Sequence, residues 1–271
     1  MVLSVNTNLG AALALQNLNA TNKSLTKTQL NITTGLKVNG PKDDASTYAI
    51  AQNMRGDIAG FRAVRTALAG GESTVNVAIN AGQAINDLLV EMKAKVVQAN
   101  QTSLDSASRT ALHNDFIALR DQIESIVATA EFNGVNIINE SAQTFTVLST
   151  VDGSTITVSA QRLNPTSLGI NLTTLQTSSG AIAALSSINS AIVVTSDKLA
   201  ALGASSKRLE VQAEFTVKLV DILTDGVGNL VDADMAEESA KLQALQVKQQ
   251  LGVQALSIAN ATPQIILSLF Q

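Results

Sequence analysis

The residues best suited to chemistry in this chain are its single histidine, His113, and the adjacent carboxylates Asp43 and Asp44. An imidazole can bind a metal or move a proton when a second ligand or an acid lies beside it. His113 has no cysteine or second histidine to share a metal with, because the chain contains neither. Carboxylates at adjacent helix positions do not face each other, so Asp43 and Asp44 indicate a helix start.

The glycine-containing stretch "GVGNLV", Gly226 to Val231, is the nearest approach to a nucleotide-binding loop. It lacks the third glycine and the preceding strand that a dinucleotide fingerprint needs. The sequence also lacks an HExxH motif, a P-loop and a nucleophile elbow. We therefore predict a protein that is not an enzyme, with no catalytic, cofactor-binding or metal-binding residue.

The composition is apolar but poor in charge. Of 271 residues, 45% are hydrophobic and 15% charged, against about 25% charged in typical soluble domains. Asn, Gln, Ser and Thr fill the polar positions, and these side chains desolvate more cheaply than ions when they pack against protein. A net charge of -4 and 3% aromatic residues argue against binding to nucleic acid or anionic membranes.

Both ends of the chain are uncharged. Residues 1–22 and 251–271 carry no charged side chain. Polar residues interrupt each stretch, whereas a membrane span needs about 20 mostly apolar residues. The N-terminal stretch also lacks the basic segment of a secretory signal. We expect a soluble chain with no cleaved export signal and no membrane insertion.

Three long apolar stripes follow alternating steps of three and four residues. They run over residues 50–96, 112–130 and 185–223. This 3.5-residue repeat is typical of helices that wrap around one another. The segment between the second and third stripes, residues 132–174, differs: it carries the turn pairs Asn133–Gly134 and Asp152–Gly153 among β-branched residues. The predicted fold is mainly α, a long coiled-coil-like helical bundle with a small β-hairpin element.

The outermost segments are also predicted helices. Breakers separate them from the bundle at residues 38–44 and 225–229. Because the terminal helices are similar in length, we expect them to pair. The predicted domains are residues 1–40 with 229–271, and residues 41–228. The apolar frames of the two helices comprise Ala11, Leu15, Leu18, Leu25 and Ile32, and Ala244, Val247, Leu251, Ala255 and Ile258.

Such uncharged stripes need a partner, since large exposed apolar patches mark interaction surfaces. Because both ends share this character, the economical partner is another copy of the chain. A rod with unlike ends and sides can repeat without closing, which produces a helical filament.

Four stretches of the sequence resemble bacterial flagellin. "SVNTN" at Ser4 to Asn8 and "LNITTGLKVNGPKDDASTYAIAQNM" at Leu30 to Met54 are similar to the family's N-terminal signature. "TAEFNGVNII" at Thr129 to Ile138 is similar to its helix-to-hairpin junction. "ADMAEESAKLQALQVKQQLGVQALSIANATPQIILSLF" at Ala233 to Phe270 is similar to its C-terminal signature.

The resemblance implies a short flagellin without outer domains, whose terminal helices form the inner tube of the filament. It implies export by the flagellar type III apparatus to an extracellular filament used for motility. The implied partners are further copies, other flagellins, an export chaperone, and the cap and hook-junction proteins. The implied filament-core residues are Ala11, Leu15, Leu18, Leu25, Ile32, Val247, Leu251, Ala255, Ile258 and Leu267.

Two alternatives remain at this point. A hook–filament junction protein would share the paired terminal helices but would form one short ring instead of a growing filament. A membrane-active or host-binding protein would need a basic polar face on its terminal helices. The only lysines near the N-terminal stripe are Lys23 and Lys27.

The resemblance also implies two further sites. Asn133 and Gly134 are expected to lie at contacts that switch between filament forms. The stretch "LVEMKAKVVQ", Leu89 to Gln98, matches a helix motif that an innate immune receptor reads in many flagellins. It departs from that motif at Val90, Glu91, Ala94 and Lys95, which predicts weak receptor activation.

Overall fold

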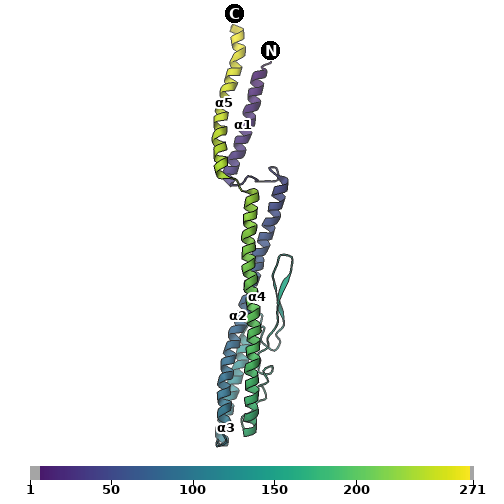
Figure 1. Cartoon of the computed structure of the whole chain (residues 1–271), viewed down its shortest axis with the longest axis vertical. Helices are drawn as coiled ribbons and strands as arrows, with labels where there is room; N and C mark the ends of the chain where they lie inside the picture. Colours follow the sequence, from purple (N-terminus) through teal and green to yellow (C-terminus); the bar gives the residue numbers. More distant parts are fainter. Residues whose placement is uncertain (1–6, 269–271) are drawn as a thin grey trace. The chain divides into compact units, whose positions relative to one another are not determined.

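The computed structural model describes residues 7–268, with side chains through residue 261. Five helices and two strands follow one another along the chain (Figure 1). They are α1 (Leu9–Thr34), α2 (Ala45–Ala99), α3 (Ser106–Thr129), β1 (Phe145–Leu148), β2 (Thr155–Val158), α4 (Ser178–Val231) and α5 (Met235–Ser268).

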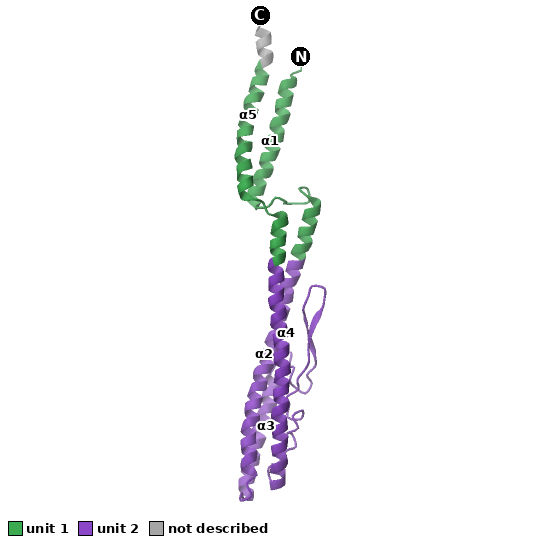
Figure 2. Cartoon of the chain, viewed as in Figure 1, with its two compact units in different colours: residues 1–56, 222–271 green, residues 57–221 purple. Residues whose placement is uncertain are grey.

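The chain divides into two compact units (Figure 2). One unit comprises residues 1–56 and 222–271, and the other residues 57–221. The predicted division instead falls at residues 40/41, between α1 and α2, and at residues 228/229, inside α4. It describes layers of a filament and stays a prediction.

The unit of residues 57–221 has a continuous apolar core. Side chains from α2, α3 and α4 meet in it, among them Leu89, Phe116 and Ile188, none of which is exposed. In α2 the buried side chains from Val64 to Val96 confirm that part of the predicted stripe, whereas Ile50, where the stripe was expected to begin, is 49% exposed. The burial of such side chains is the main favourable contribution to folding.

The turn from α2 to α3 is fixed by two side chains. Asp105 caps α3 by accepting a hydrogen bond from the backbone N–H of Ser108 at 2.8 Å. Hydrogen bonds from Ser108 hold the pKa of the Asp105 carboxyl below its ordinary value. The buried Arg109 guanidinium donates to the carbonyl oxygens of Ala99 and Gln101 at the end of α2. A cation suits the end of α2 because the last carbonyls of a helix carry the negative end of its dipole.

The predicted β element contains one antiparallel hairpin. Strands β1 and β2 pair from Phe145 opposite Val158 to Leu148 opposite Thr155. Gly153, at the predicted turn, has a φ of 89°. The other predicted turn is also present: Phe132 bridges Val135, and the residues between them, Asn133 and Gly134, have φ values of 51° and 77°.

Two glycines of α2 allow this hairpin to pack closely against the helix. A Cβ on Gly71 would lie 2.5 Å from Val147 Cγ2, and one on Gly60 would lie 2.9 Å from Val151 Cγ2. Both distances are shorter than a carbon–carbon contact. Only glycine therefore lets the hairpin valines approach the α2 backbone this closely.

The predicted break at residues 225–229 is wrong. Helix α4 continues through Gly226 and Gly228 and ends at Val231. A Cβ on Gly226 would lie 3.0 Å from Met54 Cε. Gly226 thus provides space for a neighbouring side chain, and tertiary packing outweighs its low helix propensity. The first predicted break is confirmed, because α1 ends at Thr34 and α2 begins at Ala45.

Candidate self-assembly surface

Helices α1 and α5 lie side by side, which confirms the predicted pairing of the two ends (Figure 1). Half-buried positions recur along each helix in alternating steps of three and four residues, as the seam of a coiled coil requires. On α1 they are Ala11, Ala14, Leu18, Thr21, Leu25 and Ile32, and the buried Thr28 fills the place between the last two. On α5 they are Leu242, Leu245, Gln249, Gly252, Leu256 and Ala259.

Three hydrogen bonds from polar side chains, which we call the polar ties, join the two ends of the chain. Asn8 caps α1 through its Oδ1 and donates from Nδ2 to the Ala259 carbonyl at 2.7 Å. Gln249 Nε2 donates to Asn22 Oδ1 at 2.8 Å. Asn31 Nδ2 donates to Glu238 Oε1 at 3.3 Å. Each tie joins residues more than 200 positions apart in the chain.

The third tie lies in a polar cluster at the base of the pair. Thr28, Asn31 and Glu238 are buried there. Asn39 Nδ2 donates to Asn31 Oδ1 at 3.2 Å, which links the segment after α1 to the cluster. Asp43 forms an ion pair with Lys27 at 3.2 Å, and the hydrogen bonds from Lys27 and from the Asn39 backbone hold the Asp43 pKa below its ordinary value.

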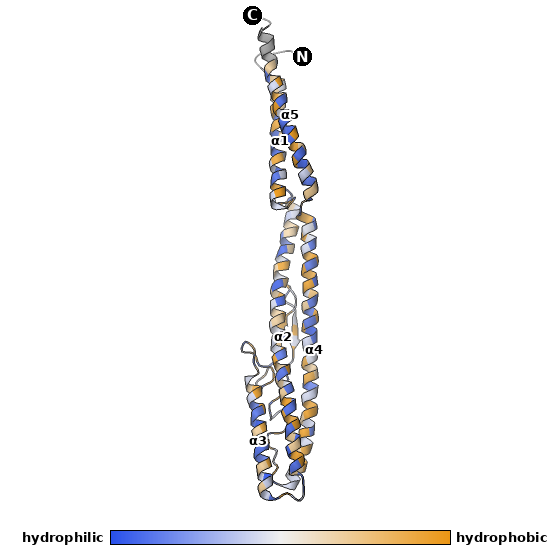
Figure 3. Ribbon diagram, turned by 90° about the vertical axis from the view of Figure 1, so that its left-hand side faces the viewer, coloured by the Kyte–Doolittle hydropathy of each residue, from blue (hydrophilic) through white to orange (hydrophobic). Residues whose placement is uncertain are grey.

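The pair buries polar groups but not its apolar ones. Within residues 9–34 and 235–261, whose side chains the structure describes, no apolar side chain is buried. Figure 3 shows apolar and hydrophilic positions alternating along both helices. The pair therefore has a seam but lacks a closed core.

A second apolar face of α5 points away from the seam. Val247, Leu251, Ala255 and Ile258 are exposed, Leu251 by 58% and Ile258 by 70% of their surface. Together with Gln250, Val253, Gln254 and Ser257, part of this face lines a shallow hollow. We call the exposed face of Val247, Leu251, Ala255 and Ile258 the outer face of α5.

Some of the residues predicted to form the filament core lie on the α1–α5 seam, and others lie on the outer face of α5. Ala11, Leu18, Leu25 and Ile32 lie on the seam of α1, whereas Leu15 is exposed. The predicted residues of α5 form its outer face instead of its seam. The side chain of Leu267 lies outside the described residues.

The seam of α5 was missed because two of its members are weakly apolar. Gln249 and Gly252 interrupt the run of leucines, so the sequence favoured the neighbouring frame of apolar residues. Gly252 could have identified the seam: a Cβ there would lie 3.1 Å from Leu18 Cδ1. A glycine inside a helical pattern often marks close approach to a neighbour.

The altered receptor-motif positions lie on α2. Leu89 and Met92 are fully buried in the core, whereas Val90, Glu91 and Ala94 are exposed. Lys95 is half-buried and forms a 2.8 Å ion pair with Asp115, which raises the Lys95 pKa. Three of the four altered side chains are thus accessible to a partner.

The remaining sequence candidates have structural roles. Asp44 accepts hydrogen bonds from the backbone N–H groups of Ser46 and Thr47 at 3.0 and 3.2 Å, as a cap of α2 does. His113 Nδ1 accepts from the Leu175 N–H at 3.4 Å. The described residues contain no group of three or more His, Asp or Glu side chains that could hold a metal.

Helix α4 also carries apolar residues on its surface, including Val193, Val211 and Phe215. Among the described residues it is the one helix long and apolar enough to cross a membrane by length and composition. This is weak support for a membrane span, because core helices of water-soluble bundles have the same character.

Comparison with known proteins gives matches to both halves of the chain. The sequence profile for the bacterial flagellin N-terminal helical region matches residues 5–143. The profile for the bacterial flagellin C-terminal helical region matches residues 185–270.

Individual proteins match over the whole chain. Flagellin FljK of Caulobacter vibrioides is 49% identical over 269 residues, which cover 99% of this chain and 98% of that protein. A flagellin of Brucella melitensis is 35% identical, with 99% of each chain covered.

Two solved structures share the fold. A Bacillus cereus flagellin has a TM-score of 0.50 at 22% identity, covering 54% of this chain and 86% of that one. A putative flagellar hook-associated protein from Vibrio parahaemolyticus has a TM-score of 0.57 at 13% identity, covering 70% of this chain and 100% of that one.

Proposed function

The chain belongs to the bacterial flagellin family and is a structural subunit of the flagellar filament, and we propose that it enters the filament through the outer face of α5. In this proposal the seam holds α1 and α5 together, and the outer face contacts other copies. The paired helices then form the inner tube of the filament.

The observation that carries the proposal is the absence of a closed core in the pair. None of the apolar side chains described in α1 and α5 is buried. Two helices cannot enclose both a seam and a second apolar face, so the outer face needs other helices to cover it. In a polymer of identical chains these helices come from neighbouring copies.

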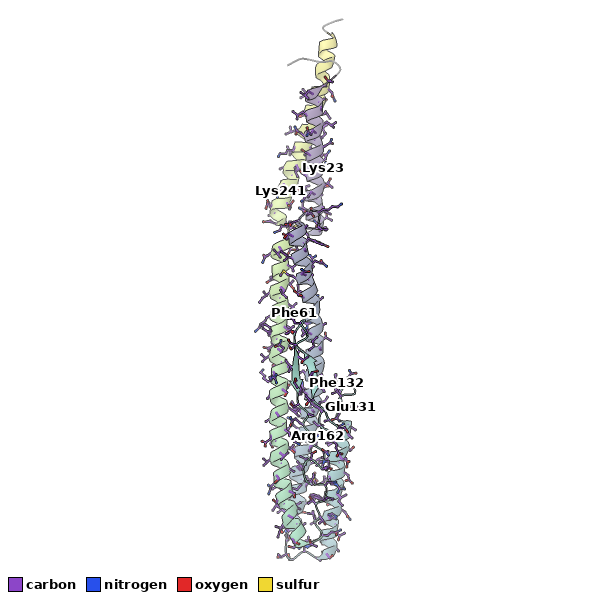
Figure 4. All side chains as sticks on the ribbon, turned by 90° about the vertical axis from the view of Figure 1, so that its right-hand side faces the viewer. Lys23, Phe61, Glu131, Phe132, Arg162 and Lys241 are labelled. Carbon is purple, nitrogen blue, oxygen red and sulfur yellow. The ribbon has the colours of Figure 1, made fainter. Side chains whose placement is uncertain are left out.

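The charge distribution supports the same surface. From Gln249 to the end of the chain the sequence has no ionisable side chain. Lys241, near the start of α5 (Figure 4), forms ion pairs with Glu237 and Glu238. Burying a charge without a partner is costly. A segment enclosed on all sides by neighbouring copies has to be free of such charges.

The remaining parts of the proposal concern how the chain reaches the filament. We infer that the chain is secreted by the flagellar type III apparatus to the extracellular filament. Its proposed partners before and during assembly are an export chaperone, the cap, the hook-junction proteins and other flagellins. The support is the membership in the family over its full length.

The test is a charged substitution on the outer face. Leu251→Glu should prevent seeded polymerisation, measured by sedimentation and electron microscopy, while the helix content of the monomer stays unchanged. Leu172→Glu is the matched control, because Leu172 is 94% exposed in a loop and the same charge is introduced. Normal filaments from Leu251→Glu would refute the role of this face.

The same assay separates the alternative function. A hook–filament junction protein would add one layer to a seed and stop, whereas a filament subunit continues to extend it. The relatives matched over the full chain are flagellins, so the junction protein is not favoured.

A further inference from the structure

A cavity of about 350 Å³ lies in the unit of residues 57–221, outside the regions discussed so far. Three segments meet around it: α3, the stretch that follows the Asn133–Gly134 turn, and the loop from residue 164 to residue 171. Seven oxygen-bearing side chains line it: Glu124, Asn139, Glu140, Ser141, Asn164, Thr166 and Asn171.

Two amide oxygens of this cavity lack a partner. Asn164 is only 7% exposed, and its Oδ1 is buried without a hydrogen bond. Asn139 Oδ1 is also buried without one. Buried polar atoms are almost always paired, and an exception calls for an explanation such as an ion or a water.

Loose packing does not account for these two oxygens, because the backbone around them is well bonded. The Asn164 carbonyl accepts from the Leu168 N–H at 3.1 Å, and the Asn139 carbonyl accepts from the Ala142 N–H at 3.2 Å. The N–H of Asn139 donates to Asn136 Oδ1 at 3.0 Å. The local fold is thus defined, and it leaves the two amide oxygens unsatisfied.

Two carboxylates complete the set. Glu124 and Glu140 are exposed, and neither forms an ion pair with any described residue. The two carboxylates and the two unpartnered amide oxygens all accept hydrogen bonds and donate none. What such a site attracts is a positive charge.

We propose that Glu124, Asn139, Glu140 and Asn164 bind a calcium ion. Calcium takes six to eight oxygen ligands from carboxylates, amides and waters in flexible geometry, whereas magnesium demands a near-ideal octahedron. The cavity is much larger than a bare ion, so waters complete the coordination. Because waters remain, we expect a dissociation constant of about 10⁻⁴ to 10⁻³ M, as in extracellular calcium modules.

Hydrogen bonds already join these segments: Asn136 Nδ2 donates to the Val127 carbonyl at 2.7 Å, and the Arg120 guanidinium of α3 donates to the Asn171 carbonyl at 3.1 Å. Bound calcium would add a further link from α3 to the stretch after the Asn133–Gly134 turn and to the loop of residues 164–171. This role is independent of the outer face of α5, which lies in the other compact unit.

The test is calorimetric titration of the full-length monomer with CaCl₂. One calcium should bind per chain, and Glu124→Gln with Glu140→Gln should weaken binding at least tenfold, since two charges are lost at nearly constant shape. Asn164→Asp should act in the opposite direction and tighten binding, because it adds a ligand charge. MgCl₂ titrated into the same protein should bind more weakly than CaCl₂.

Glu131→Gln is the control, because Glu131 is an exposed carboxylate that follows α3 without lining the cavity (Figure 4). It should bind calcium as the unchanged chain does. No binding up to about 10 mM CaCl₂, ten times the weakest affinity expected, would overturn the proposal and leave a water as the occupant. Unchanged binding by the double glutamine variant would overturn it as well.

Discussion

The α1–α5 pair and the three-helix core of residues 57–221 are both built on a 3.5-residue repeat, yet they use it differently. In the core, side chains such as Leu89, Phe116 and Ile188 are completely buried. In the pair, the described buried side chains are Thr28, Asn31 and Glu238, and all three are polar. The same pattern thus produces a finished core in one region and a half-covered seam in the other.

This difference shows that an apolar repeat in the sequence does not reveal whether a single chain can bury all of the repeat's apolar residues. Three helices can enclose a stripe, whereas two leave part of it exposed. Stability of the core region is therefore a property of the monomer, and stability of the pair depends on assembly. The predictions below test this contrast.

The largest effect is expected from deleting residues 251–271. This removes most of the outer face of α5 and should abolish polymerisation, because neighbouring copies lose the surface they cover. Circular dichroism of the truncated monomer should still show most of the helix content, since the core of residues 57–221 is untouched. Filaments of normal length from the truncated chain would contradict the contrast.

A matched pair of truncations to alanine measures the contrast in the monomer. Phe116→Ala should lower the free energy of unfolding by about 3–5 kcal/mol, as large-to-small changes in closed cores do. Leu18→Ala, on the half-buried seam, should lower it by less than about 1 kcal/mol. Urea unfolding at concentrations that prevent assembly is the measurement, and equal losses would show that the pair is as closed as the core.

The exposed side of the core region can be tested through immune recognition. Val90, Glu91, Ala94 and Lys95 depart from the receptor motif, while buried Leu89 and Met92 keep the helix packed. We expect receptor activation at least about 30-fold weaker than with a motif-bearing flagellin, since losing a charged contact at an interface costs at least 2 kcal/mol. A cell reporter assay measures this, and equal potency would refute it, while filament assembly should be normal.

Neighbouring glycines of α2 test how tightly the hairpin is seated. Gly71→Ala should destabilise the monomer by about 1–3 kcal/mol, because its Cβ overlaps Val147 and overpacking has this cost. Gly70→Ala meets nothing within 4 Å and should stabilise the helix by about 0.5–1 kcal/mol. Thermal unfolding of the two variants should therefore shift in opposite directions.

The smallest effect on assembly is expected at the Asn133–Gly134 turn. Gly134→Ala places a side chain at a φ of 77°, which costs about 1–2 kcal/mol. Because we predict that this turn lies at a switching contact, filament curvature should change more than assembly yield. Electron microscopy of filaments gives both quantities, and unchanged curvature across several variants of the turn would count against the prediction.

Much of the fold could be predicted because long apolar stripes specify helices strongly. The helices of the core, both turns of the β element and the pairing of the ends all followed from periodicity and turn chemistry. The break expected at residues 225–229 failed because glycine signals both flexibility and close packing. Only the position of Met54 beside Gly226 distinguishes the two.

The candidate surface was predicted less completely. On α5 two overlapping frames are apolar, and a repeat alone cannot tell which one meets α1. The choice depends on Gly252 lying against Leu18 and on Gln249 bonding Asn22, which are contacts between distant parts of the chain. The cavity beside Asn164 was not foreseen, because its four ligand candidates come from three separate segments.

Two of the three polar ties of the α1–α5 pair also act against misalignment, because each joins two particular side chains. A leucine repeat tolerates a slide by seven residues, since the same kind of side chain then returns to each place. A slide separates Asn22 from Gln249 and Asn31 from Glu238, whereas the tie from Asn8 is less selective because it ends on a backbone carbonyl. A slid pair would bury Glu238 without Asn31, and polar seam residues set alignment in this way at some cost in stability. The α1–α5 pair thus carries its own means of rejecting a misaligned pairing.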